Sequence, residues 1–119
     1  MIRIDKKRLV KVHCYDFGWF RDNEVVENEH IIFKNNLVIW GEGVFFVNCL
    51  FEMGEYSLSE DHGSLFENCE FYGHDFPGQT ENFSLYAQKS EFYNCTFYDV
   101  SQKFIKNAEC CEFINLTSK

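Results

Sequence analysis

Two short segments combine carboxylate and imidazole side chains and so offer acid–base chemistry. The first runs Glu60-Asp61-His62-Gly63 and the second Gly73-His74-Asp75. A carboxylate beside a histidine can act as a general acid and a general base. Asp, His and Gly are also common in turns for conformational reasons alone. We interpret both segments as structural turns and expect no catalytic residues, with a carboxylate–histidine site as the alternative.

The six cysteines are the second candidates for chemistry: Cys14, Cys49, Cys69, Cys95, Cys110 and Cys111. None stands in a Cys-x-x-Cys spacing. The adjacent pair Cys110-Cys111 would point to opposite faces of a strand, which suits neither a zinc site nor a disulfide. We therefore expect no metal and no cofactor. A nucleophilic role for Cys95 is an alternative, but its position in an internal repeat favours burial as a small apolar side chain.

The repeat reads Phe-x-Asn-Cys-x-Phe and occurs at 46–51, 66–71 and 92–97, with a relaxed copy at 108–113. In a straight strand, Phe and Cys three residues apart would face opposite sides. The Asn between them tolerates a left-handed backbone and can bond to an Asn in a neighbouring layer. Each copy therefore predicts a strand, a bend at the Asn, and a second strand, with both aromatic residues and the Cys facing inward.

Apolar runs at 37–40, 56–58, 83–87 and 103–106 precede the four copies and predict a third strand in each repeat. Three strands per repeat describe a coil that stacks on the next coil. The inward positions then form columns: Phe46, Phe66, Phe92 and Ala108; Cys49, Cys69, Cys95 and Cys111; Phe51, Phe71, Phe97 and Phe113; with Asn48, Asn68 and Asn94 at the bends.

This pattern resembles the right-handed parallel β-helix repeat of pectate-lyase-like proteins, over about residues 37–116. The resemblance implies an all-β fold, a short right-handed parallel β-helix of about three to four coils. It also implies a polysaccharide-binding or lyase-like fragment as one alternative function. A pentapeptide-repeat coil is disfavoured by the unequal repeats, and a β-sandwich or α+β domain is the remaining alternative. We expect residues 1–36 to form strands that cap the coil and residues 37–119 to form the coils, within a single domain.

Charge and hydropathy narrow the class of partner. The chain has 19 acidic and 11 basic residues, for a formal net charge of -8. This balance argues against direct binding of nucleic acid and suits a basic protein.

No stretch approaches the ~20 apolar residues of a membrane span. Residues 1–8 are charged but lack the apolar core of a secretory signal, so we expect a cytoplasmic protein that does not bind membranes.

Outward positions beside the Asn bends predict a face of carboxylates and tyrosines that binds the partner. The predicted partner-binding residues are Glu52, Glu67, Glu70, Tyr72, Tyr93, Tyr98, Glu109 and Glu112. Tyrosine supplies anchors and glutamate supplies steering and specificity in such interfaces. A solvated acidic strand surface is the alternative.

These features together predict a non-catalytic inhibitor that occludes a basic protein, either a toxin or a nucleic-acid-processing enzyme. Immunity proteins that neutralise nuclease toxins are similar in being small, acidic and without a signal segment. Phage-encoded inhibitors of host defence that mimic nucleic acid are an alternative with the same profile. A structural module that self-associates through its C-terminal coil is a third possibility.

Overall fold

The computed structural model describes residues 11–15, 18–34, 37–54, 58–60, 63–73, 85–100 and 105–114. Every regular element in these ranges is a β-strand, and the strands pair in parallel. They stack as a β-solenoid of about three turns. The predicted all-β coil is confirmed.

Three parallel sheets, here named A, B and C, form the walls of the solenoid. Sheet A contains, in order, β1 (Lys11–Tyr15), β4 (Glu29–Phe33), β7 (Leu50–Gly54), β10 (Glu70–Gly73), β12 (Thr96–Tyr98) and β14 (Glu112–Ile114). Sheet B contains β2 (Gly18–Trp19), β5 (Leu37–Trp40), β8 (Leu58–Glu60) and the start of β11 (Leu85–Tyr93). Sheet C contains β3 (Val25–Glu27), β6 (Phe45–Val47), β9 (Leu65–Glu67), the end of β11, and β13 (Ile105–Glu109).

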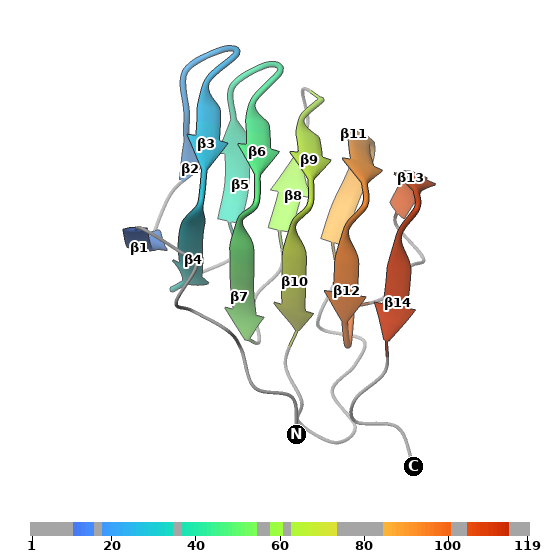
Figure 1. Cartoon of the computed structure of the whole chain (residues 1–119). Coiled ribbons are helices and arrows are strands. Elements are labelled where there is room, and N and C mark those ends of the chain that lie inside the picture. The colour runs from blue at the N-terminus through green and yellow to red at the C-terminus, as the bar shows by residue number, and fades with distance from the viewer. Residues whose placement is uncertain are drawn as a thin grey trace.

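Each turn visits sheets B, C and A in that order. Three turns have a separate strand in each sheet: β2-β3-β4, β5-β6-β7 and β8-β9-β10. In the following turn the single strand β11 serves both B and C before β12, and β13 and β14 then extend sheets C and A. Figure 1 shows the strands of sheet C side by side, with those of sheet A continuing from them below.

A residue with left-handed backbone separates sheet C from sheet A in each turn. Asn48, Asn68 and Asn94 have φ angles of 54°, 54° and 56°. The side-chain amide of Asn94 also donates a hydrogen bond to that of Asn68 in the adjacent layer. The predicted Asn bend is therefore confirmed. It allows the aromatic residue before the bend and the Cys after it to share one interior.

The aromatic columns are also confirmed. Phe46, Phe66 and Phe92 lie above one another, with ring centroids 4.9 and 4.8 Å apart. The second column holds Phe51, Phe71, Phe97 and Phe113, at successive separations of 4.6, 4.9 and 4.6 Å. Rings from the two columns meet edge to face, as in the 5.4 Å contact between Phe46 and Phe51. Offset stacking and edge contacts are both favourable arrangements of aromatic rings.

The thiols form a third column inside the solenoid. Cys49, Cys69 and Cys95 are each 1% exposed or less. Each Sγ lies 3.4 or 3.5 Å from a backbone carbonyl oxygen of the preceding layer, to which its S–H donates. Burial raises the pKa of the Cys69 thiol well above its usual range, so this thiol stays protonated. The hydrogen bond with the Cys69 thiol lowers the pKa of Cys95, the candidate nucleophile, but Cys95 is itself 1% exposed and lies among packed interior side chains.

Residues 18–33 repeat the same arrangement with different side chains. Asn28 has a φ angle of 57° and stands between β3 and β4. Val26 pairs with Phe46, and Ile31 pairs with Phe51. The coil therefore begins before residue 37. The Phe-x-Asn-Cys-x-Phe motif did not identify this copy in the sequence, because aliphatic residues replace both Phe. The role of residues 1–36 as a cap stays a prediction.

The last turn keeps the bend but changes its residues. Cys110 takes the bend position with a φ angle of 55°. Ala108 pairs with Phe92 and is exposed, whereas Phe92 is 1% exposed. The inward residues Cys111 and Phe113 are only half-buried. Among the described residues, no strand pairs with the far side of β13 or β14.

Candidate protein-docking face

The outward side chains of sheets C and A form what we call the front face, because both sheets look towards the same side of the molecule (Figure 1). On sheet C these side chains form two columns. The column before the bend contains Glu27, Val47, Glu67, Tyr93 and Glu109, and the outer column contains Val25, Phe45, Leu65, Glu91 and Asn107. On sheet A one column is His30, Leu50, Glu70, Thr96 and Glu112, of which His30 and Leu50 are buried. The other column is Ile32, Glu52, Tyr72, Tyr98 and Ile114.

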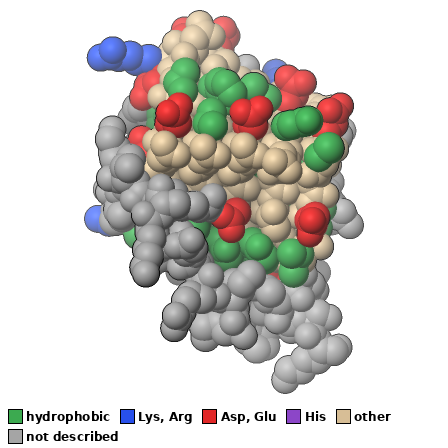
Figure 2. Space-filling model, in the orientation of Figure 1, with side chains coloured by type: hydrophobic (Ala, Val, Ile, Leu, Met, Phe, Trp, Pro, Cys, Tyr) green, Lys and Arg blue, Asp and Glu red, His purple; other side chains and the backbone are tan. Residues whose placement is uncertain are grey.

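The front face is acidic and carries apolar side chains between its charges. Its carboxylates are Glu27, Glu67, Glu91 and Glu109 on sheet C and Glu52, Glu70 and Glu112 on sheet A. None of the positions in these four columns is Lys or Arg. Lys89 stands in β11 two residues before Glu91, outside the columns. Figure 2 shows carboxylates interspersed with apolar side chains over the face, with Lys and Arg at its margins.

Glutamates occupy every second layer of the column before the bend. Val47 lies in register between Glu27 and Glu67, and Tyr93 lies in register between Glu67 and Glu109. Because layers are ~4.8 Å apart, successive carboxylates stand roughly 9–10 Å from one another. This spacing exceeds the Debye length of about 8 Å at physiological ionic strength, which limits their mutual repulsion. The column is a regular series of anionic and apolar positions.

The outer column of sheet C divides the sheet into two halves. Its first three residues are apolar: Val25 is 57% exposed, and Phe45 and Leu65 are half-buried. The column then continues with the exposed polar residues Glu91 and Asn107. The outer column is therefore apolar over β3, β6 and β9. We call the part of sheet C over β9, β11 and β13, which holds Glu67, Glu91 and Glu109, its acidic half.

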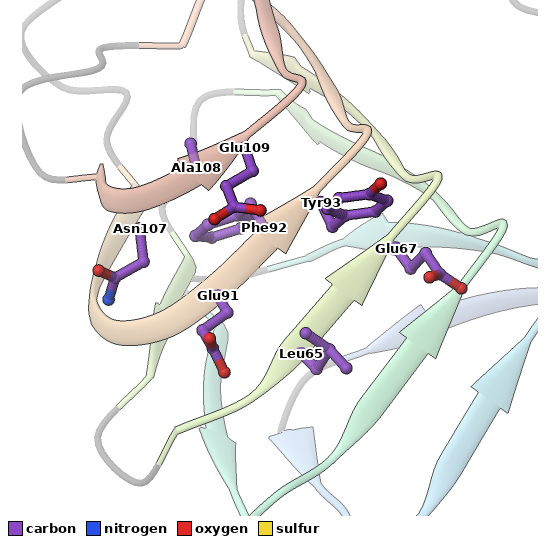
Figure 3. Close-up of a pocket in the computed structure, with 8 residues that line it drawn as sticks. All are labelled: Leu65, Glu67, Glu91, Phe92, Tyr93, Asn107, Ala108 and Glu109. Carbon is purple, nitrogen blue, oxygen red and sulfur yellow. The ribbon is translucent and has the colours of Figure 1, made fainter.

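A shallow hollow of about 560 Å³ lies on the acidic half, lined by Leu65, Glu67, Glu91, Phe92, Tyr93, Asn107, Ala108 and Glu109. Figure 3 shows the Tyr93 ring between Glu67 and Glu109, with Glu91 in the neighbouring column. Tyr93 is 46% exposed. An aromatic face surrounded by carboxylates suits a cationic side chain, which gains both ion pairs and cation–π contact.

The predicted residues on sheet A are largely engaged with one another. The Nε2 of His30 lies 2.8 Å from the Oε2 of Glu52, and His30 is 1% exposed. Tyr72 is only 8% exposed, stacks on Tyr98 at 4.5 Å, and donates its hydroxyl to Glu70 at 3.0 Å. These contacts hold the side chains of sheet A in place and leave Tyr72 little surface for a partner.

The structure therefore distributes the eight predicted binding residues over both sheets. Glu67, Tyr93 and Glu109 share one column of sheet C. Glu70 and the exposed Glu112 share one column of sheet A, and Glu52, Tyr72 and Tyr98 share the other. The prediction omitted the outer column of sheet C and Glu27, although period-two alternation from Val47, Glu67 and Tyr93 would have found Phe45, Leu65 and Glu91. Their role in binding stays a prediction.

The other candidate for chemistry is the pair of carboxylate–histidine segments. Asp61, His62, His74 and Asp75 lie outside the described residues. Within the ranges that the structure describes, no three His, Cys, Asp or Glu side chains gather as a metal site would require. The same ranges contain no helix with the length and apolar character of a membrane span.

Comparisons with models of protein families, with curated proteins and with solved structures found no match to this chain. The likeness to pectate-lyase-like proteins is therefore one of repeat pattern, and the structure supports it as far as the solenoid.

Proposed function

We propose that this protein is a non-catalytic inhibitor that binds a basic protein and occludes it with the front face. One observation carries the proposal: four columns on adjoining sheets hold seven glutamates, no Lys or Arg, and exposed apolar side chains between the charges. The solenoid needs buried inward side chains to fold, but it does not need carboxylates at these outward positions. Val25 and Tyr93 are 57% and 46% exposed on this face, where a partner would cover them.

The two kinds of side chain have separate roles in the proposed complex. The carboxylates attract a cationic surface and accelerate association, as complementary charge does in other complexes. Exposed aromatic and aliphatic side chains such as Tyr93 then lose contact with water and slow dissociation. The rigid stacked coil keeps both sets in place before binding, which reduces the entropy lost on association.

The form of this function that we favour is a cytoplasmic immunity protein that neutralises a nuclease-type toxin. A nuclease needs a cationic surface to hold phosphates, and that surface is complementary to the front face. A phage-encoded inhibitor of a host nucleic-acid-processing enzyme would use the same face, so the identity of the partner distinguishes the two. The lyase-like alternative depends on Asp61, His62, His74 and Asp75 instead.

The test measures binding to, and inhibition of, a panel of basic nucleases, including any nuclease encoded by a reading frame next to that of this chain. We expect a stoichiometric complex and loss of the nuclease activity. The double variant Glu67→Lys with Glu70→Lys should abolish inhibition, while circular dichroism and urea unfolding show that it still folds. Full inhibition by the folded double variant would show that the front face is not the binding surface.

A further inference from the structure

We infer that the docking surface is sheet C, and that its occupant is a basic amphipathic α-helix of the partner protein, lying across the strands. This inference rests on the proposed function and adds to it the surface used and the element recognised.

Sheet C is favoured over sheet A because its apolar side chains are exposed, whereas several side chains of sheet A already contact one another. On sheet A, Glu52 lies against His30, and the Tyr72 hydroxyl donates to Glu70. On sheet C, Tyr93 and Val25 are 46% and 57% exposed. A partner would displace existing contacts on sheet A, whereas on sheet C it would cover apolar surface that now faces water.

The spacing of charges selects the secondary structure of the occupant. Glu27, Glu67 and Glu109 repeat every second layer, roughly 9–10 Å apart. An α-helix crossing the strands brings residues i and i+7 onto one face about 10.5 Å apart. A β-strand lying in that direction would bring its same-face side chains ~6.7 Å apart. Its basic residues would then not stay opposite glutamates that repeat roughly every 9–10 Å. The remaining mismatch of about 1 Å per repeat is within reach of long, flexible Lys and Arg side chains.

The two columns of sheet C then define the helix sequence. Basic residues at i, i+7 and i+14 face the three glutamates, and apolar residues on the turns between them face Val47 and Tyr93. The cation nearest the hollow lies between Glu67 and Glu109, where the Tyr93 ring adds a cation–π contact. Apolar residues on the adjoining stripe of the helix cover Val25, Phe45 and Leu65.

A second copy of this chain does not fit as the occupant. Sheet C packed against itself would bring glutamate columns of like charge together without cations between them. The described residues of this chain also contain no helix to offer. A helix from a basic protein supplies both the cations that pair with the glutamates and the helical element itself.

The test uses a synthetic peptide of about 18 residues with arginines at i, i+7 and i+14 and leucines at i+3, i+4, i+10 and i+11. A control peptide has the same composition and the same leucine positions, but its arginines stand at i, i+5 and i+13 and so point in different directions around the helix. Isothermal titration at low salt measures the affinity of the native protein for each peptide. We expect the patterned peptide to bind about tenfold more tightly than the control.

Paired protein variants locate the surface. Glu67→Lys with Glu109→Lys on sheet C should weaken binding of the patterned peptide about tenfold, because two ion pairs become repulsive contacts. Glu70→Lys with Glu112→Lys makes the same charge change on sheet A and should weaken it less than about threefold. Urea unfolding verifies that both variants fold, and Tyr93→Ala gives a second, uncharged probe of sheet C.

Each outcome has a distinct meaning. Greater loss in the sheet A variant would overturn the assignment to sheet C while leaving the basic-partner function in place. Equal affinity for the two peptides, or no binding of either, would overturn the helical occupant. The inhibition assay with the panel of basic nucleases decides the proposed function independently of both results.

Discussion

A bend residue with positive φ follows each strand of sheet C and precedes the next strand of sheet A. The equivalent positions are Asn28, Asn48, Asn68, Asn94 and Cys110. The left-handed conformation costs most residues about 1–2 kcal/mol, and Asn pays less than other non-glycine types because its short amide bonds locally. The presence of Cys110 in the last turn shows that the backbone bend does not require an amide.

Replacing one bend residue separates the backbone effect from the amide effect. We expect Asn68→Ala to lower the free energy of unfolding by about 1–2 kcal/mol, because Ala is strained at a φ angle of 54°. Asn68→Gly should lower it less, since Gly adopts positive φ without a steric penalty and loses only the exposed hydrogen bond with Asn94. Urea unfolding measures both. Equal losses in the two variants would mean that the side-chain hydrogen bond of Asn68, and not backbone strain, accounts for most of the lost stability.

The residue types in the repeat were sufficient to predict the bends and the interior columns, but not how exposed each outward side chain is. The recurrence of Asn48, Asn68 and Asn94 between Phe and Cys identified both features. The burial of Tyr72 at 8% exposure was not predicted, because alternation gives only the side of the strand on which a residue lies. Exposure also depends on what packs over that side, and no local pattern encodes it.

Each turn of the solenoid contacts only the turns before and after it, so an element's contribution depends on its place in the stack. Phe71 has stacked rings on both sides, Phe51 and Phe97, and is fully buried. Phe113 stacks on Phe97 and is half-buried in the last described turn. In such nearest-neighbour architectures a terminal unit has fewer favourable contacts to lose.

Truncating the two rings therefore gives a graded loss of stability. We expect Phe71→Ala to reduce the free energy of unfolding by about 3–5 kcal/mol, through lost burial and the cavity left behind. Phe113→Ala should cost less than about half of that amount, because its ring is partly in water and its site can collapse. Thermal and urea unfolding compare the two variants with the native chain. A larger loss for Phe113→Ala would show that the last turn is covered in solution and is not an open end.

The first full turn, β2-β3-β4, shows which strands the repeat motif can identify and which it misses. A search for Phe-x-Asn-Cys-x-Phe finds the turns whose columns are filled by rings and thiols. It misses β3 and β4, in which Val26 and Ile31 fill the same columns and Glu29 takes the Cys position. Aliphatic and aromatic side chains are interchangeable in a packed column when the total volume fits. Backbone pairing therefore persists after the sequence motif has disappeared.

At the scale of the whole molecule, the net charge of -8 acts at long range and the front face acts at contact. A field from all the charges accelerates encounter with a basic partner and is screened by salt. Only the side chains buried in the complex determine how long the complex lasts. Glu67 lies in the column before the bend on sheet C, whereas the exposed Glu42 lies in the turn between β5 and β6.

Two single charge reversals distinguish these contributions, because Glu67→Lys and Glu42→Lys change the net charge equally. At low salt we expect both to reduce the association rate constant with the inhibited nuclease by a similar factor, about two- to threefold, and added salt should remove this effect. Only Glu67→Lys should raise the dissociation rate constant, by about tenfold, because a contact in the interface becomes repulsive. Stopped-flow mixing measures the first constant and surface plasmon resonance the second. An equal rise in dissociation for Glu42→Lys would indicate that the complex is held by net charge alone, without a defined docking surface on sheet C.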